Sequence, residues 1–404
     1  MNSFREENLP ANLLNVLDSI GFTKPTPIQS ETLGLVLKEG QDILGTAQTG
    51  TGKTGAFAIP LTAKLLRDKS VRVVVLTPTR ELAAQVTKVF GKLLSADRKI
   101  QQVLLIGGVP IAKQFKCLKR NPRLIIGTPG RINDHLDRGT LKLDMACILV
   151  LDETDMMLDM GFDVQIARII ERMSCIRQRL MFSATLPPKI ERLAGKYLEE
   201  PARISIGRVS SPHAAITQET IALERGMNKY QKLLEELETR KGSIIIFVQT
   251  RNKAAMLADQ LKAAGCNSIA LHGQLSQPRR KQVLMGFREE KYRLLVATDV
   301  ASRGLDVPHV RHVINYDLPQ CAEDYIHRIG RTARAGQKGS ALSFLTKQNR
   351  NMWEEIQELV DPSGSPKRTR THRQNRGDGF KNRKRAKGRR FRSRGSIAAH
   401  TRKK

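Results

Sequence analysis

The chain has 404 residues, enough for two domains of ordinary size, and 40% of them are hydrophobic, as in a globular protein. Its formal net charge is +30, and residues 364–404 hold 17 Lys and Arg against one Asp. This excess, in the body and in the tail, favours a polyanionic partner. The five cysteines form no C-x-x-C pair, which argues against a zinc site. With no signal-peptide core at residues 1–7 and no apolar run near ~18 residues, we expect a cytoplasmic protein without membrane contact.

In chain order, the sequence first predicts a helix over residues 9–20, followed by a proline-stiffened loop that extends to residue 29. Gln29 offers a donor and an acceptor that match the edge of an adenine. Phe22 can lie against the face of a base. On these residues alone, an ordinary connector remains the alternative.

The next stretch, residues 47–54, has the pattern of a phosphate-binding loop. It lies between a short apolar run and a predicted helix over residues 54–66, so backbone N–H groups at the helix start would face phosphates. Lys53 adds a positive charge, and the Thr54 hydroxyl can ligate Mg²⁺. Ala47 replaces the first glycine of the usual pattern, so a chance loop remains the alternative for this stretch by itself. The predicted nucleotide-binding residues here are Ala47, Gln48, Thr49, Gly50, Thr51, Gly52, Lys53 and Thr54.

Apolar strand patterns then alternate with helical patterns in both halves of the chain. Continuous β-branched runs between helices are typical of a parallel sheet that is buried on both faces. The expected strands cover residues 72–77, 102–106, 124–127, 147–151 and 179–182, and then 243–248, 268–271, 293–297, 312–315 and 340–345. The expected helices include residues 80–94, 164–173, 252–264, 277–288 and 322–329. We expect a linker at residues 207–216 and a disordered tail from residue 363.

Two carboxylates follow the apolar run that ends at Leu151. We assign Asp152 to the metal, through water, and Glu153 to the general base that activates the attacking water. An acidic turn after a strand is the alternative. The hydroxyls of Ser183 and Thr185 can couple this loop to the rest of the site, although an N-cap before the following prolines explains them equally well.

The second half contains a dense basic segment at residues 325–336. Arg328 and Arg331 are three residues apart, so on a helical turn both would point the same way and could act as arginine fingers on phosphates. Asp306 can bond a ribose hydroxyl. A solvated basic face is the alternative for the arginines.

Taken in order, AQTGTGKT, PTREL, GG, TPGR, DETD, SAT, ATDVASRGLD and HRIGRTARAG resemble the motifs of the DEAD-box ATP-dependent RNA helicases, over residues 4–346. The resemblance implies an α/β protein with two tandem RecA-like domains, ATP and Mg²⁺ between them, and RNA across both. The implied division is residues 1–206 with an adenine-recognition motif at 4–29, a linker at 207–216, residues 217–362, and a basic disordered tail at 363–404.

The resemblance also implies roles for individual residues. Phe4, Phe22, Thr26 and Gln29 match the adenine motif. RNA-backbone contacts are implied for Pro78, Thr79, Arg80, Gly107, Gly108, Thr128, Pro129, Gly130, Arg131, Thr250, Arg251, Gly273, Gln277, Arg280 and Thr298. Coupling between the domains is implied for Asp299, Arg303 and His327. The chain departs from the usual motifs at Thr154, Ser302 and Ala333.

We therefore expect an ATP-dependent RNA helicase that separates short duplexes locally or remodels RNA–protein complexes, such as ribosome precursors or the RNA-decay machinery. An ATP-gated RNA clamp without unwinding and a DNA-directed helicase are the alternatives. We interpret the tail as a non-specific RNA tether, with a solvated extension as the alternative.

Overall fold

The computed structural model describes residues 3–38, 40–47, 51–206, 216–224, 226–302, 307, 309–333 and 338–360. The chain divides into two units, residues 1–365 and 366–404, and the described elements all belong to the first. None of the helices in the described ranges is both long and apolar enough to cross a lipid bilayer.

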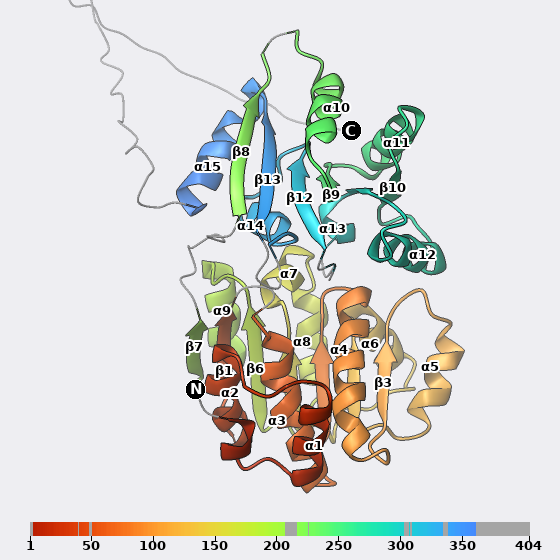
Figure 1. Cartoon of the computed structure of the whole chain (residues 1–404). Coiled ribbons are helices and arrows are strands. Elements are labelled where there is room, and N and C mark those ends of the chain that lie inside the picture. The colour runs from red at the N-terminus through yellow and green to blue at the C-terminus, as the bar shows by residue number, and fades with distance from the viewer. Residues whose placement is uncertain are drawn as a thin grey trace, which may run out of the picture. The chain divides into compact units, whose positions relative to one another are not determined.

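A seven-stranded sheet forms the first lobe of this unit (Figure 1). Its strands are β1 (Ile43–Ala47), β2 (Val73–Leu76), β3 (Gln102–Leu105), β4 (Leu124–Gly127), β5 (Ile148–Leu151), β6 (Gln178–Ser183) and β7 (Ala202–Ile206). They follow the order β3-β4-β2-β5-β6-β1-β7, and all neighbours are parallel.

Helices cover both faces of this sheet. They are η1 (Phe4–Glu6), α1 (Ala11–Ser19), α2 (Pro27–Leu37), α3 (Lys53–Arg67), α4 (Arg80–Leu93), η2 (Leu94–Ala96), α5 (Ile111–Leu118), α6 (Pro129–Asp137), α7 (Thr154–Asp159), α8 (Asp163–Glu171) and α9 (Pro188–Tyr197). Successive strand residues point to opposite faces, so Val73 and Val75 pack in one core with α1 to α4, whereas Val74 and Leu76 pack in another with α6 to α9. Burial of both faces explains the continuous apolar runs in the sequence.

The second lobe repeats this plan on a six-stranded parallel sheet of order β10-β11-β9-β12-β13-β8. Its strands are β8 (Ile216–Ala222), β9 (Ser243–Phe247), β10 (Ser268–Leu271), β11 (Leu294–Ala297), β12 (Val310–Asn315) and β13 (Gly339–Leu345). Its helices are α10 (Lys229–Thr239), α11 (Arg251–Ala263), α12 (Gln277–Arg288), α13 (Asp299–Ser302), α14 (Ala322–Ile329), η3 (Lys347–Asn349) and α15 (Arg350–Val360). The predicted pair of parallel-sheet α/β domains is confirmed.

The local differences from the sequence prediction have physical causes. Strands β7 and β8 were not predicted, because each lies at a sheet edge and has only one buried residue, so neither has a continuous apolar run. Ile216 is the first residue of β8 and not the end of a linker, and residues 207–215 lie outside the described ranges. The loop expected through residue 29 ends earlier, because Pro27 occupies the first turn of α2, where proline is favoured.

The chemistry-bearing motifs lie directly after strands. The phosphate loop follows β1, the PTREL segment follows β2, and the DETD segment follows β5. In parallel sheets such positions share one edge, the carboxyl edge, where ligands of open α/β sheets bind. Residues 250, 273–280 and 298–302 have the same relation to the second sheet.

Candidate active site

The phosphate loop leads from β1 into α3. Gly52 has a φ of 95°, which is the left-handed region that glycine tolerates, and it caps the N-terminus of α3. Lys53 and Thr54 open the helix, so its first N–H groups and its positive dipole end face the loop. The described part of the loop therefore has the geometry of an anion site, and Gln48, Thr49 and Gly50 lie outside the described ranges.

Gln29 connects the N-terminal helices to this loop. Its Nε2 donates to the Gly52 carbonyl at 3.2 Å, and its Oε1 accepts from the Thr26 amide at 3.0 Å. A Cβ at Gly55 would lie 2.4 Å from Gln29 Nε2, so the glycine is what lets the amide approach. Phe22 is partly exposed, whereas Phe4 is buried in the core, so only Phe22 of the two offers a ring surface to a ligand.

Lys53 and the carboxylates after β5 form a buried charged cluster. Lys53 Nζ lies 3.3 Å from Glu153 Oε1. Burial lowers the pKa of Lys53, but the carboxylates Glu153, Asp152 and Asp155 outweigh it, so the net shift is upward and the lysine stays charged. Burial, reinforced by the charge of Glu153, raises the pKa of Asp152 to about 7, and Lys53 opposes that shift. Glu153 has a φ of 54°, an uncommon backbone conformation, and its side chain pairs with Lys53.

The donor set fits a hydrated divalent cation. Asp152 Oδ1 and Glu153 Oε2 are buried and have no hydrogen-bond partner among the described residues, which is costly unless a ligand satisfies them. Carboxylate and hydroxyl oxygens are ligands that Mg²⁺ prefers. Thr54, half-buried at the start of α3, supplies such a hydroxyl.

Asp155 ties the carboxylate loop to the segment after β6. Its Oδ2 accepts from the amides of Ala184 and Thr185, both at 3.0 Å, and from the Thr185 hydroxyl at 3.1 Å. The Ser183 hydroxyl bonds the Thr185 carbonyl, so Ser183 acts only through Thr185. The N-cap of α9 is Pro187, so the N-cap alternative for these hydroxyls is wrong.

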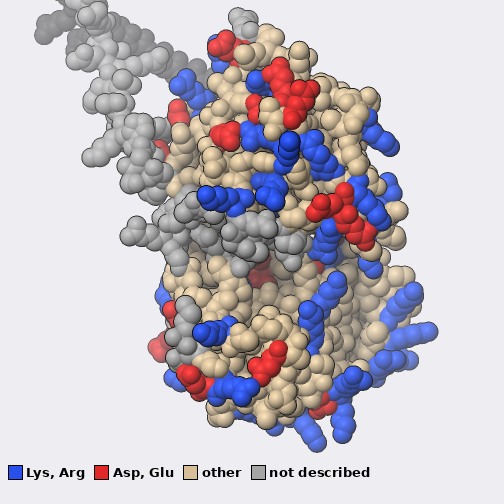
Figure 2. Space-filling model, in the orientation of Figure 1, with Lys and Arg blue, Asp and Glu red and all other residues tan. Residues whose placement is uncertain are grey.

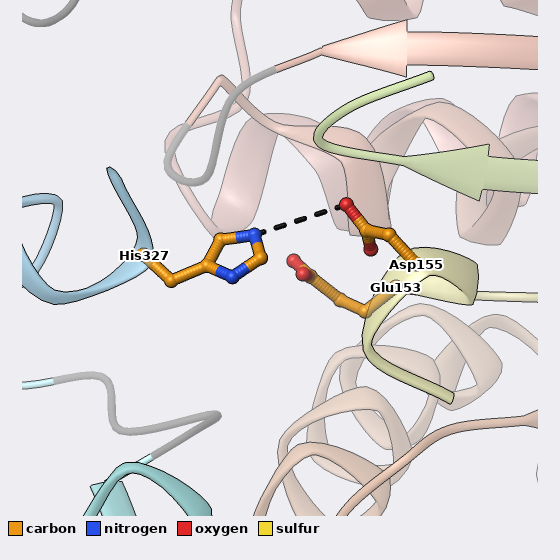
Figure 3. Close-up of side chains that lie close together, drawn as sticks. All are labelled: Glu153, Asp155 and His327. Atoms are coloured by element: carbon orange, nitrogen blue, oxygen red, sulfur yellow. Dashed lines mark ion pairs between the residues drawn. The ribbon is translucent and has the colours of Figure 1, made fainter. Parts of the chain in front are cut away.

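The same carboxylate faces the second lobe. His327 Nε2 lies 3.8 Å from Asp155 Oδ2, with Glu153 beside them (Figure 3). Burial lowers the pKa of His327, but Asp155 and Asp324 outweigh burial and raise it to about 9. Burial raises the pKa of Asp155, but His327, with the charge of Lys53, outweighs burial and keeps it below its usual range. At neutral pH the two lobes therefore share an ion pair at this point.

The two candidate arginine fingers have different environments. Arg328 is fully buried and bonds Asp299 with two nitrogens, while its third nitrogen donates to Asn315 Oδ1 at 3.1 Å and the Asp317 carbonyl at 2.6 Å. Its guanidinium also lies 4.8 Å from the centre of the Phe247 ring. The side-chain donors of Arg328 are thus used inside the second lobe, and its expected role as a finger on phosphates stays a prediction. Arg331 lies beyond the end of α14 and its Nε donates to the His327 carbonyl.

Several residues expected to contact RNA meet one another across the lobes. Arg80 Nη1 donates to Gln277 Oε1 at 3.2 Å, and the Arg280 Nε bonds the Glu81 carboxylate. Arg80 packs on Gly107 and Gly108, where any Cβ would lie within 2.7 Å of its guanidinium. The carboxyl edges of both sheets are therefore joined directly at this point.

The other expected RNA-contact residues lie at the same two edges. Thr79 and Thr250 cap α4 and α11 with their side chains, and Arg131 holds the glycine loop through the Val109 carbonyl at 2.9 Å. Exposed or half-buried positions are occupied by Gly107, Gly108, Thr128, Gly130, Arg131, Arg251, Gly273 and Gln277, and buried ones by Pro78, Pro129 and Thr298. Arg303 and Asp306 lie outside the described ranges.

The sequence did not predict the basic surface formed by α5 and the turn after it. Lys113, Lys116, Lys119 and Arg120 are all exposed, and Figure 2 shows Lys and Arg side chains gathered at the edge where α5 lies. The helix follows Gly107 and Gly108 closely, and Gln114 fixes it to the Ile106 carbonyl at 2.8 Å. The three-residue spacing of the lysines was the available signal.

The sequence did not predict the ion-pair partners of Asp155, Glu81 and Asp317. Their partners are His327, Arg280 and the lysines Lys229 and Lys253. Each partner is distant in sequence, so only the fold brings them together.

The fold has two RecA-like lobes. The first carries a phosphate loop and paired carboxylates, and a histidine of the second lies beside them. This arrangement defines a nucleotide-hydrolysing protein with a site shared by both lobes. The DEAD/DEAH box helicase family matches residues 26–193, and the helicase conserved C-terminal domain matches residues 228–336. The chain belongs to the DEAD-box family of ATP-dependent RNA helicases.

Relatives and solved structures agree with this assignment. The DEAD-box ATP-dependent RNA helicase CshA of Geobacillus kaustophilus is 40% identical over 86% of this chain and 74% of its own length. The ATP-dependent RNA helicase CshA of Listeria monocytogenes is 41% identical over 85% of this chain and 66% of its own length. The structure of S. cerevisiae Dbp5 bound to RNA and ADP BeF3 has a TM-score of 0.81 and 33% identity, over 89% of this chain and 94% of that one. Mss116p bound to ssRNA and AMP-PNP has a TM-score of 0.80 and 30% identity, over 88% of this chain and 76% of that one.

Proposed function

We propose that the chain hydrolyses ATP when RNA is bound, and that it uses the cycle to separate short RNA duplexes locally or to remodel RNA–protein complexes. The observation that carries this proposal is the buried cluster of Lys53, Asp152 and Glu153, with His327 of the second lobe 3.8 Å from the neighbouring Asp155. Because the site takes residues from both lobes, hydrolysis depends on contact between the lobes.

Within this site we assign roles from the contacts. The amides at the start of α3 and Lys53 hold the phosphates, and Glu153 takes the proton of the attacking water. Mg²⁺, held by Thr54 and, through water, by Asp152, would neutralise charge on the phosphates. Phe22, Thr26 and Gln29 receive the adenine. Arg331 completes the site from the second lobe, while Arg328 positions it through Asp299.

RNA would lie along the two carboxyl edges that Arg80, Gln277 and Arg280 join. Contacts of this kind reach phosphate and sugar, so binding would be largely independent of sequence. The exposed lysines of α5 extend the positive surface beyond the glycine loop. Hydrogen bonds across the lobes make closure and RNA binding mutually dependent.

The same proposal includes domain limits at residues 206, 217 and 362 and a cytoplasmic location. It also includes partners such as ribosome precursors or the RNA-decay machinery. They rest on the resemblance, on the positive charge and on the lack of any membrane-length apolar run in the sequence.

The decisive experiment replaces Glu153 with Gln, which keeps the size of the side chain and removes the base. RNA-stimulated ATPase should fall by ~10²–10⁴, the usual contribution of a general base. RNA binding in the presence of a non-hydrolysable ATP analogue should persist and serves as the folding control. Hydrolysis close to the unmodified rate would show that the base is another group.

Two further assays separate the alternatives. Strand displacement on a short RNA duplex distinguishes a helicase from an ATP-gated clamp, which would bind and hydrolyse without displacing the strand. ATPase stimulation by RNA and DNA of matched length distinguishes RNA from DNA as the substrate.

A further inference from the structure

A second cluster of positive charge lies at the other edge of the second sheet. The neighbouring strands β9, β12 and β13 begin there, at the amino edge, opposite the edge that carries the nucleotide and RNA residues. The starts of these strands line an open surface cavity of about 390 Å³, within the usual range for ligand sites. Its lining residues are Lys241, Gly242, Arg311, His312, Lys338, Gly339 and Ser340.

The cavity has positive charges and no carboxylate among its lining residues. Lys241, Arg311 and Lys338 are exposed and make no ion pair within the described ranges. The nearby carboxylates are already engaged, because Glu219 and Glu236 both pair with Arg240, at 2.6 and 3.0 Å. Three cations without a protein counter-ion around one cavity favour an anionic ligand.

The local backbone is shaped to place Arg311. Strand β12 shifts register against β9 between Val310 and His312, which pair with Ser243 and Ile244, so Arg311 is the extra residue of a β-bulge. Its side-chain stem lies over Gly242, which has a φ of 96° and where a Cβ would come within 2.8 Å of Arg311 Cγ. A bulge and a left-handed glycine therefore act together to direct this guanidinium.

The polar base of the cavity is held in one arrangement. His312 bonds the Lys241 carbonyl through Nε2 at 2.9 Å, which assigns the proton to Nε2 and leaves Nδ1 to accept from the Ser340 hydroxyl at 2.7 Å. Ser340 in turn accepts from Arg240 Nη1 at 3.1 Å. This chain ties the starts of the three strands together, so the surrounding cations project from a fixed frame.

We propose that this cavity binds a phosphate-bearing anion, with Lys241, Arg311 and Lys338 as its ligands. The cavity is large for a single phosphate and suits a group that carries more than one. Such a group belongs either to a small polyphosphorylated molecule or to the backbone of a nucleic acid. The site is independent of the hydrolytic function, since it uses none of the residues of that site.

The test compares two charge-matched triple variants of the full chain. One combines Lys241→Gln, Arg311→Gln and Lys338→Gln; the control combines Lys69→Gln, Lys142→Gln and Arg172→Gln, which are exposed cations of the first lobe. Inorganic tripolyphosphate is titrated calorimetrically with the nucleotide site filled by saturating ADP and Mg²⁺. A single-stranded RNA is titrated in parallel by fluorescence anisotropy at several salt concentrations. Thermal unfolding verifies that each variant is folded.

Removal of three charge-assisted hydrogen-bond donors should weaken binding at this site by at least about tenfold, against less than about twofold in the control. A selective loss of affinity for tripolyphosphate identifies a small anion as the ligand, and a selective loss of affinity for RNA identifies a nucleic-acid phosphate. Equal behaviour of both triple variants with both probes overturns the proposal.

A second variant tests the geometry without changing charge. Gly242→Ala should displace Arg311 and weaken the same ligand several-fold, in a chain that keeps all three cations. Affinity equal to that of the unmodified chain, in a folded Gly242→Ala protein, would contradict the assigned role of the bulge.

Discussion

Ala333 occupies a backbone conformation that suits glycine better. Its φ is 53°, in the left-handed region, where a Cβ costs roughly 1–2 kcal/mol. The sequence suggested this difficulty, because the related motifs more often have glycine here. We expect Ala333→Gly to raise the free energy of unfolding by about 0.5–1 kcal/mol, measured by urea denaturation, since relief of strain is partly offset by the greater freedom of an unfolded glycine. A lower stability would mean that the methyl group makes a contact that outweighs the strain.

The other two departures from the usual motifs are accommodated by hydrogen bonds to the backbone. Thr154 Oγ1 donates to the Leu151 carbonyl at 3.2 Å, and Ser302 Oγ donates to the Asp299 carbonyl at 3.0 Å. Both hydroxyls are therefore satisfied where they are buried, and neither disturbs the carboxylates beside it.

The pair His327 and Asp155 should make contact between the lobes sensitive to alkaline pH. The pKa of His327 is raised from 6.5 to about 9, so its contribution is complete below pH 6.5 and disappears as the pH rises through about 9. We expect the affinity for RNA, measured with a saturating non-hydrolysable ATP analogue, to fall by more than about tenfold between pH 7.5 and 10, because the shift exceeds one unit.

The matched control for this effect is His327→Gln, which cannot titrate. Its affinity should be lower at pH 7.5 and should change little up to pH 10. A pH profile that is the same in both proteins would assign the titration to another group.

At the scale of elements, we expect Arg328 in α14 to have a structural role and Arg331, in the turn after it, to have a catalytic one. Arg328 forms a buried pair with Asp299, and removing one partner of such a pair costs about 3–5 kcal/mol. We expect Arg328→Ala to lower the unfolding free energy of the chain by that amount. Arg331 is also buried and bonds the His327 carbonyl, so Arg331→Ala should cost some stability too, and its distinguishing effect should be a fall in kcat of the RNA-stimulated ATPase by ~10³ or more, as expected for an arginine finger.

The unfolding free energy and kcat are both measured on each variant. Arg328→Lys tests whether a positive charge alone is enough to keep the stability. Lysine cannot reproduce the two-pronged bond to Asp299, so it should restore little of the stability. If Arg328→Ala retains full stability and loses only kcat, both arginines act as fingers.

The predictability of each element follows from its burial. The central strands β2, β4, β5, β9 and β11 are buried along their whole length, so their residues form apolar runs that the sequence displays. The edge strands β7 and β8 each bury only one residue, so their sequences resemble those of loops. Helix α2 was hidden by Pro27, a residue that disrupts helices elsewhere and is favoured in the first turn.

At the scale of the whole molecule, the sequence predicts which segments form the candidate site but not the contacts that join the two lobes. Lys53, Asp152 and Glu153 belong to local motifs, and their proximity follows from the shared carboxyl edge of one sheet. The ion pairs Asp155–His327 and Glu81–Arg280 connect different lobes, so they depend on a contact that no local pattern encodes. The pairing of Arg328 with Asp299 could not be predicted either, because the spacing of Arg328 and Arg331 predicts only that their side chains point the same way.

The last prediction concerns the basic tail. Residues 361–404 lie outside the described ranges, so this prediction rests on their charge. Residues 364–404 carry 17 Lys and Arg, each able to release a counter-ion from RNA. Deleting residues 363–404 should weaken binding of a single-stranded RNA and flatten the dependence of log Kd on log salt concentration, by about 0.7 for each phosphate that the tail neutralises in the full chain. The kcat of the ATPase at saturating RNA should be unchanged, because the hydrolytic residues lie within residues 47–331.

The control replaces the tail with a Gly/Ser segment of equal length, which separates the effect of charge from the effect of length. A salt slope equal to that of the full chain would show that the tail does not contact RNA phosphates and leave it as a solvated extension.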